Sequence, residues 1–529
     1  MNKPLMLSLS VAALLSTNLS AQSMYEKFEA MELEMAKMKK ELQELKAKSQ
    51  APVLKEEEKE DKKELAQKDD EKESDEPKES DEKGMNVEEE IASLQESVSE
   101  LNKNTSGSHL KFGVDYRFAL ENLQYEMASG DTVDNEAFMT NRFWMNMDWA
   151  ANDNLSFSAQ LAYNKAFGAR SGTEGNAANA FDTFDWIANE NAYNDTLRVR
   201  SVYFLYRNDT FLEADVPWTF SIGRRPSTNG HLINLRDDDK AASPMGHSIN
   251  VEFDGLSAKF DIENLTNVDG MYVKLCAGRG MSNAAPKFNS TPYSSVDDAN
   301  AANPDIDLIG LIFTPYSDGQ YSINTQYYYA NNLIDGDFNA TGAFEGFDTV
   351  GGLHSFTANL IVNGIGNGLS EYLDDSTFFV SGAMSQTAPE SDKSMLTTEL
   401  GESKTGYSYW AGLQMPSFIT DDGRWGLEYN HGSQYWRSIT YGEDTNIGSK
   451  IAARGNAYEA YFTEYLVDDI LSMQIRYTYI DYDYTGSNGF FGGTTGNSVL
   501  ISDIPSTDAM AAQVVDKAQD IRFYLRYKY

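Results

Sequence analysis

Six charged side chains lie close together between positions 224 and 239. They are two adjacent arginines, a third arginine and three consecutive aspartates: Arg224, Arg225, Arg236, Asp237, Asp238 and Asp239. A pore selects ions by charged side chains at its narrowest point. If this stretch lies in a pore, its arginines could form one side of a constriction and its aspartates the other. An external loop with solvated charges is the simpler alternative.

A histidine and a serine two residues apart could do a different chemistry. His431 and Ser433 would share one face of a strand, because side chains alternate between the two faces. Histidine as base and serine as nucleophile form a pair used in covalent hydrolysis. The pair resembles the Asn-His-x-Ser-Asn-Gly motif of outer-membrane phospholipases, although Gln434 and Tyr435 replace the final Asn-Gly. An aromatic girdle with a polar rim is the favoured alternative, and we expect no enzyme.

The remaining residues give no sign of a cofactor or metal centre. The other histidines lack metal-ligand spacing, and no phosphate-binding loop or dinucleotide fingerprint occurs. The single cysteine, Cys276, excludes an internal disulfide framework and is interpreted as a buried or lipid-facing small residue. A formal net charge of −38 disfavours a nucleic-acid partner. We therefore expect neither cofactor nor metal.

The last nine residues indicate which kind of element positions these groups. Ile521, Phe523, Leu525, Tyr527 and Tyr529 would occupy one face of a strand, and Arg522, Tyr524, Arg526 and Lys528 the other. A terminal aromatic strand resembles the closing strand of a Gram-negative outer-membrane β-barrel, whose apolar face meets lipid and whose polar face lines a lumen. Basic residues of this strand and of the run 197–207 could then form a lumen patch favouring anions: Arg198, Arg200, Arg522, Arg526 and Lys528. Acidic loops could equally favour cations.

From position 109 onward the hydrophobic period is two, which is typical of strands. Seventeen runs are candidates, and the even strand numbers of bacterial barrels favour sixteen, with fourteen to eighteen possible. One candidate is the run Gln434–Tyr441. Short connections at 151–154, 317–319 and 421–423 are interpreted as periplasmic turns. Extracellular loops are predicted at 168–196, 280–304, 331–353, 386–406 and 483–520.

The first hundred residues have a different organisation. Residues 1–21 are predicted to be a signal peptide, and 22–50 a coiled coil with a strict heptad seam of Met, Phe and Leu. Residues 51–84 are a charged, disordered linker and 85–106 a second coiled-coil segment. The fold class is therefore an all-β transmembrane antiparallel β-barrel, residues 107–529, preceded by an α-helical coiled-coil segment.

Four runs resemble a family of exported, porin-like proteins of Gram-negative bacteria that is catalogued as a domain of unknown function. They lie at 223–228, 241–255, 427–436 and 454–461. The resemblance covers 110–529 and implies an outer-membrane barrel without naming a substrate. In trimeric porins a similar strand ending in Gly-Arg leads into a loop that folds inside the barrel. This second resemblance implies that Pro226–His247 is the constriction.

The expected function is an outer-membrane porin that passes small hydrophilic solutes or ions by diffusion. The coiled coil would trimerise it and place an arm in the periplasm. Its expected partners are outer-membrane lipid, lipopolysaccharide and the barrel-assembly machinery. Alternatively, the barrel anchors an arm that tethers peptidoglycan or a periplasmic partner. A lipolytic enzyme built on His431 and Ser433 is a minor alternative.

Overall fold

The computed structural model describes residues 110–167, 193–226, 230–281, 284–285, 294–295, 305–338, 344–440, 443, 445–487 and 497–529. The predicted signal peptide, both coiled-coil segments and the charged linker lie outside these residues. Within the described part, no helix combines the length and hydropathy needed to cross a membrane.

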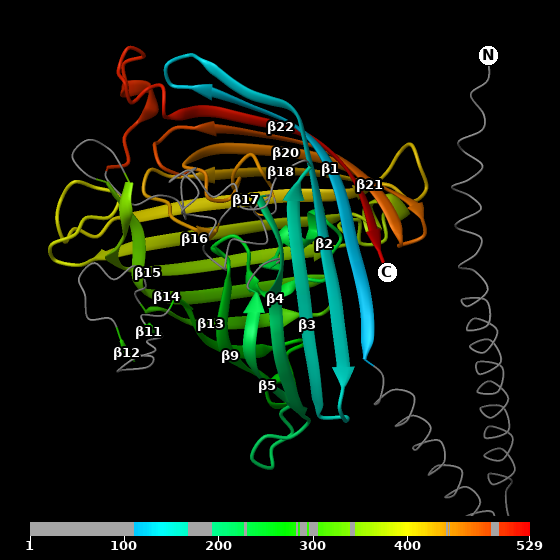
Figure 1. Ribbon diagram of the computed structural model, residues 1–529. Coiled ribbons are helices and arrows are strands. Elements are labelled where there is room, and N and C mark those ends of the chain that lie inside the picture. The colour runs from blue at the N-terminus through cyan, green and yellow to red at the C-terminus, as the bar shows by residue number, and fades with distance from the viewer. Residues whose placement is uncertain are drawn as a thin grey trace, which may run out of the picture. The chain divides into compact units, whose positions relative to one another are not determined.

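Sixteen antiparallel strands close into one barrel (Figure 1), which confirms the predicted antiparallel β-barrel and its strand number. The last strand pairs with the first, so that Arg117 lies opposite Arg526. Each wall strand pairs with the next wall strand along the chain. The wall strands are β1 (Lys111–Met127), β2 (Thr132–Ala150), β3 (Leu155–Ala166), β4 (Tyr193–Asn208), β5 (Trp218–Pro226), β9 (Glu252–Asp261), β10 (Tyr272–Met281), β13 (Ile306–Ser317), β14 (Tyr321–Phe338), β15 (Phe344–Asn363), β16 (Thr377–Pro389), β17 (Thr405–Pro416), β18 (Arg424–Gly432), β20 (Gly455–Val467), β21 (Leu471–Tyr482) and β22 (Val515–Lys528).

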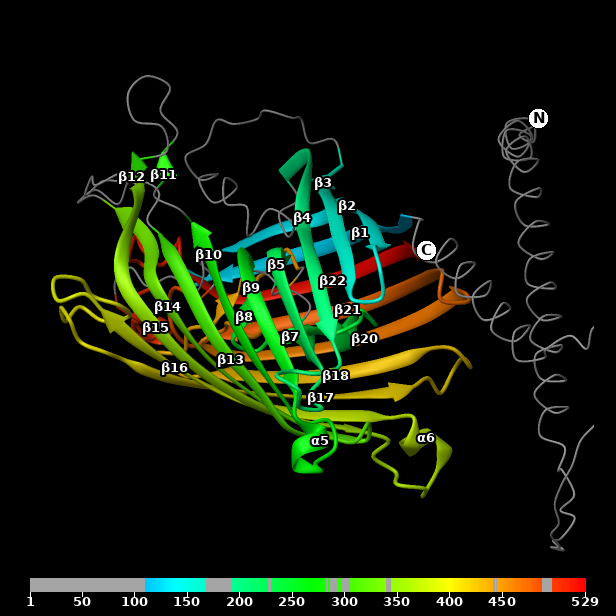
Figure 2. The same cartoon turned by 90° about the horizontal axis from the view of Figure 1, so that it is seen from below.

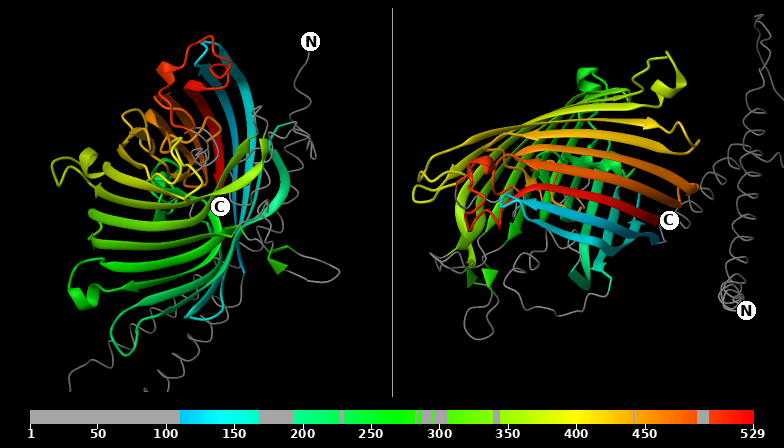
Figure 3. Two further views of the ribbon diagram at one scale, coloured as in Figure 1. Left: turned by 90° about the vertical axis from the view of Figure 1, so that its left-hand side faces the viewer. Right: turned by 90° about the horizontal axis from the view of Figure 1, so that it is seen from above.

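Alternating side chains give the wall an apolar outer face and a polar inner face. In β22, Arg522 and Arg526 are buried inside, whereas Ile521 and Leu525 are exposed outside. The neighbouring strands repeat this arrangement around the ring. Figure 3 shows the course of the strands from two further sides. The predicted alternation of the terminal strand is therefore confirmed.

Two details of the predicted strand map are wrong. The run Gln434–Tyr441 is not a wall strand. Of its described residues, 434–440, only Ile439–Thr440 (β19) form a strand, which pairs with Ile249–Asn250 (β8) rather than with the wall. The predicted loop at 331–353 is largely strand, since β14 extends to Phe338 and β15 begins at Phe344, so that the two form a long hairpin. Bulges near Ala330 and Leu333 interrupt the alternation there and hide the strand period.

One end of the barrel carries short connections, including the predicted turns at 151–154, 317–319 and 421–423. Two one-turn helices, α5 (Glu263–Thr266) and α6 (Glu371–Asp374), lie in the connections of this same end (Figure 2). The opposite end carries the longer connections. Two of these fold into the lumen and are named here by position. The first inner segment is 230–251, and the second inner segment comprises the described residues 433–440, 443 and 445–454.

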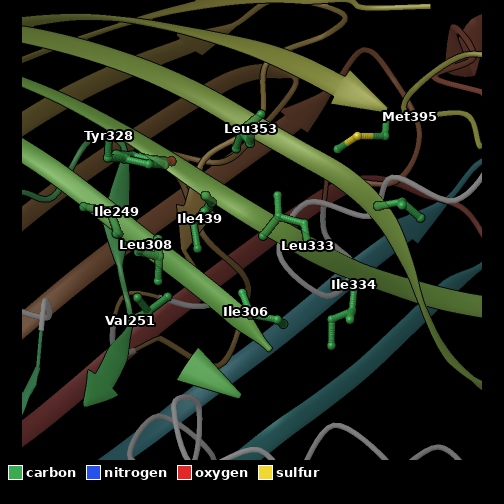
Figure 4. Packing of buried hydrophobic residues seen from close by; sticks show 12 residues of the cluster. Ile249, Val251, Ile306, Leu308, Tyr328, Leu333, Ile334, Leu353, Met395 and Ile439 are labelled. Atoms are coloured by element: carbon green, nitrogen blue, oxygen red, sulfur yellow. The ribbon is translucent and has the colours of Figure 1, made fainter. Parts of the chain in front are cut away.

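Short elements shape the first inner segment. They are β6 (Gly230–His231), α4 (Ile233–Arg236), β7 (Ala242–Met245) and β8. Its end packs in a buried apolar cluster with β19 and with inward side chains of β13, β14 and β15 (Figure 4). Ile249 and Val251 come from the first segment, and Ile439 comes from the second. The two inner segments therefore share one small core inside the barrel.

Candidate functional site

The first inner segment crosses the lumen. It leaves the wall at β5 and returns at β9, yet its residues bond to strands on the opposite side of the ring. The Leu235 carbonyl accepts from Gln414 of β17 at 2.9 Å, and the Arg236 carbonyl accepts from Gln474 of β21 at 2.8 Å. The Met245 amide donates to Gln326 of β14 at 2.9 Å. The first inner segment therefore reaches from one side of the closed wall to the other.

Arg236 is a fully buried residue of this segment with several charged partners. Its Nη1 lies 3.3 Å from both carboxylate oxygens of Glu459, and its Nη2 donates to the Glu443 carbonyl at 2.6 Å. Burial alone would lower the pKa of Arg236, but the surrounding carboxylates, above all Glu459, raise it well above its ordinary value. The guanidinium is therefore permanently charged and locked to the wall.

Lys450 of the second inner segment completes this buried network. Its Nζ lies 2.5 Å from the carboxylates of both Glu428 and Glu459. Since Glu459 also contacts Arg236, one carboxylate joins both inner segments to β20. Sequence reasoning missed Glu428, Glu459 and Lys450. The available signal was the presence of acidic residues at inward positions of otherwise alternating strands.

The three predicted aspartates meet part of the predicted basic lumen patch. Arg526 contacts Asp115 at 2.5 Å and Asp239 at 2.7 Å, and Lys528 lies 3.0 Å from Asp239. Asp237 accepts from Tyr524 at 3.3 Å, and Asp238 accepts from Tyr465. Asp239 is therefore paired with two cations of the predicted patch, whereas the carboxylates of Asp237 and Asp238 accept from tyrosines of the wall.

The two adjacent predicted arginines have different partners. Arg224 is largely buried, with 12% of its side chain exposed, and contacts the buried Glu252 as well as Asp254. Arg225, the next residue, lies over the Tyr203 ring and lines the cavity described below. Successive residues of one strand start from opposite faces, so these two arginines do not act as one group.

Other basic residues of the predicted patch also have partners inside. Arg200 lies 3.2 Å from Glu252, and Arg522 lies 3.3 Å from Glu121. Arg198 occupies the same strand as Arg200, two residues earlier.

His247 anchors the far end of the first inner segment. Its two ring nitrogens each lie 2.8 Å from a serine hydroxyl, Ser381 of β16 and Ser408 of β17. The edges of Trp410 and Trp436 pack against the ring. Burial lowers the pKa of His247 to about 3, so the imidazole is neutral at ordinary pH.

His431 and Ser433 have separate partners in the structure. The His431 Nδ1 lies 3.1 Å from Asn456 Oδ1, and its ring packs beside Tyr409. The Ser433 hydroxyl accepts from the Tyr407 amide at 2.8 Å. The aromatic surroundings match a girdle position.

A cavity of about 710 Å³ remains beside the first inner segment. It lies between this segment and the inward faces of strands from β2 to β14. Its lining includes Arg200 and Arg225 from the predicted residues, with His231 and Lys240 from the segment itself. No group of acidic, histidine or cysteine side chains suited to holding a metal ion occurs among the described residues.

Comparisons with known proteins complete the description. A family profile described as "Protein of unknown function (DUF3373)" matches residues 132–529. No curated protein matches. Among solved structures, outer-membrane expressed OmpT of Vibrio cholerae has 12% identity, a TM-score of 0.42, and coverage of 79% of this chain and 97% of that chain. OmpF of Salmonella typhi, in complex with daunomycin, has 11% identity, a TM-score of 0.42, and coverage of 79% and 98%.

Proposed function

Because the chain belongs to the DUF3373 family of proteins of unknown function, we propose a function from its own architecture. The protein is an outer-membrane pore through which small hydrophilic solutes or ions diffuse. The observation that carries this proposal is a closed wall, apolar outside and polar inside, whose lumen is narrowed by one of its own segments.

The outer face suits a lipid environment. Large apolar side chains are exposed along strands all around the ring, including Phe204, Leu311, Val380 and Ile475. In water such a continuous surface would be costly, whereas in a bilayer it faces hydrocarbon. Closure of the wall pairs its backbone groups, which a bilayer requires.

The inner face suits a hydrated passage that is narrowed but still has open volume. Inward positions carry charged and amide side chains, and the first inner segment spans the lumen beside the open cavity. Narrow points lined by charge are the usual basis of selectivity in pores. A diffusion pore needs no catalytic group, and we infer no enzymatic role for His431 or Ser433.

The assembly that we propose is a trimer with a periplasmic arm. The predicted coiled coils at 22–50 and 85–106 would hold three barrels together. The expected neighbours are outer-membrane lipid, lipopolysaccharide and the barrel-assembly machinery.

Single-channel recording in a planar bilayer tests this function. Purified, folded protein should give conductance steps, and the trimer should give them in groups of three. A folded protein without conductance would overturn the pore, and single steps would overturn the trimer. A variant lacking residues 24–106 should keep its conductance while losing the groups of three.

A further inference from the structure

The cavity beside the first inner segment has an excess of positive charge. Five cationic side chains line it: Arg200, Arg225, Lys240, Lys259 and Lys274. Among its described lining residues, Asp148 is the one carboxylate. Two nearby acids, Glu252 beside Arg200 and Asp261 beside Lys259, lie outside the lining and offset part of this charge. The net charge of the cavity lining together with these two acids is still positive.

The opposite side of the lumen differs. There several cations of the wall and the inner segments are paired with buried carboxylates, as in the pairs Arg236–Glu459, Arg522–Glu121 and Arg526–Asp115. Positive charge and space therefore coincide on one side of the segment.

Two of the cavity cations are held in fixed positions against aromatic rings. The Arg225 guanidinium lies 4.4 Å from the centre of the Tyr203 ring and donates to the Ser257 hydroxyl at 3.1 Å. The Lys259 ammonium lies 4.3 Å from the centre of the Tyr272 ring. Such cation–π contacts hold the two charged groups against the faces of the aromatic rings.

The rest of the lining is largely apolar. Leu205, Phe253, Leu308 and Ile312 contribute to it together with the tyrosines. Ligand sites of a few hundred Å³ typically combine such walls with a few placed polar groups. An inorganic ion would use the charges of this cavity but not its apolar surface.

We propose that this cavity is a selectivity site for small organic anions, meaning carboxylates or phosphate esters that carry an apolar or aromatic part. The proposal rests on the proposed pore function and adds the class of solute to it. The cations attract the anionic group, and the rings and aliphatic side chains receive the remainder of the solute.

Reversal potentials in a salt gradient test the charge preference. Wild type should prefer anions, and Arg225→Gln or Lys274→Gln should each lower the anion-to-cation permeability ratio about twofold. Arg279→Gln in β10 is the control, because Arg279 is half exposed, pairs with Asp305 and Asp307, and lies outside the lining of the cavity. Conductance without anion preference, or equal shifts in Arg279→Gln and Arg225→Gln, would overturn the selectivity site and leave the pore intact. Absence of conductance would instead overturn the pore.

The single cysteine provides a second readout that requires no current. Cys276 lines the cavity two residues from Lys274, on the same inward face. A sulfonate-bearing methanethiosulfonate should modify it faster than a trimethylammonium-bearing one, after both rates are normalised to a free thiol. Lys274→Gln should reduce this ratio, and Arg279→Gln should not. Equal normalised rates for the two reagents in wild type would contradict the proposal.

An aromatic carboxylate such as benzoate tests the apolar part. Added at equal ionic strength, benzoate should reduce chloride current more than acetate does. Equal reduction by both would show that the cavity selects charge alone and would overturn the organic part of the proposal.

Discussion

At the scale of residues, buried charge pairs determine where the first inner segment lies. Arg236 and Glu459 are 223 positions apart, and Arg526 and Asp239 are 287 apart. The sequence identified Arg236 and Asp239 as charges of interest. It could not identify their partners, because a contact between distant strands depends on the register of the whole ring.

Removal of Arg236 should loosen this segment. Arg236→Ala leaves the Glu459 carboxylate buried with fewer partners, and loss of one member of a buried pair typically costs about 3–5 kcal/mol. Lys450 and Arg476 still neutralise Glu459, so we expect the lower end of this range. Urea unfolding followed by tryptophan fluorescence measures the change.

Arg424→Ala is the control for this variant. Arg424 is half exposed and lies 3.7 Å from Asp238 of the same inner segment, so its removal should cost less than about 1 kcal/mol. Equal losses in the two variants would show that burial of the Arg236 pair is not what holds the segment. Conductance should rise in Arg236→Ala and stay unchanged in Arg424→Ala.

His247 should make stability depend on pH in a defined direction. Its pKa is about 3 in the fold and 6.5 ordinarily, so between these values the unfolded chain binds a proton that the folded chain does not. The free energy of unfolding therefore falls as pH drops through this window, by about 1.4 kcal/mol per unit. His247→Gln should remove this contribution, measured as the difference between the two unfolding curves from pH 7 to 4. A difference between the two curves that stays constant from pH 7 to 4 would show that His247 does not cause the pH dependence.

At the scale of elements, the period of two predicted the wall strands, but it could not distinguish a wall strand from β19. The run Gln434–Tyr441 has the composition of a half-buried strand, and it meets a similar environment inside the lumen. What separates the two cases is a pairing partner distant in sequence, here β8. Hydrophobic pattern alone does not contain this information.

Three paired glycines in neighbouring wall strands explain how the end of the first inner segment packs against the wall. Gly223, Gly255 and Gly278 pair directly across β5, β9 and β10. The ring of Phe253 covers two of them, since a Cβ at Gly278 would lie 2.1 Å from Phe253 Cδ2 and one at Gly255 would lie 3.1 Å from Cε2. Phe253 in turn packs against the core that the two inner segments share.

Gly278→Ala should therefore displace Phe253 and destabilise the barrel by about 1–3 kcal/mol. Gly310→Ala is the matched control in the adjacent strand, where the nearest atom to the added Cβ lies 3.6 Å away. This control should be neutral or gain up to about 1 kcal/mol, because alanine loses less conformational freedom on folding. Equal effects in urea unfolding would show that the ring moves freely.

At the scale of the whole molecule, the lumen is asymmetric. The inner segments bond to strands from β14 to β22 and to the start of the ring, which leaves the open cavity against the strands from β2 to β14. The sequence predicted a ring and a charged loop within it. Which side of the ring stays open follows from long-range pairs and could not be predicted.

The apolar outer face makes the membrane-spanning role of the ring testable. Leu311 lies near the middle of β13 with its side chain exposed, beside Leu275 and Tyr327 on the neighbouring strands. A charged residue facing lipid near the midplane of a transmembrane barrel costs about 2–4 kcal/mol. The free energy of unfolding of Leu311→Arg in lipid vesicles, measured with urea, should fall by this amount.

Leu212→Arg is the control. Leu212 lies in the turn between β4 and β5 with 86% of its surface exposed, so this variant should change the free energy of unfolding little. Because both positions are exposed to the surroundings, the two variants differ chiefly in whether those surroundings are lipid. If Leu311→Arg loses no more unfolding free energy than Leu212→Arg does, then water rather than lipid surrounds the ring. That outcome would contradict a transmembrane pore.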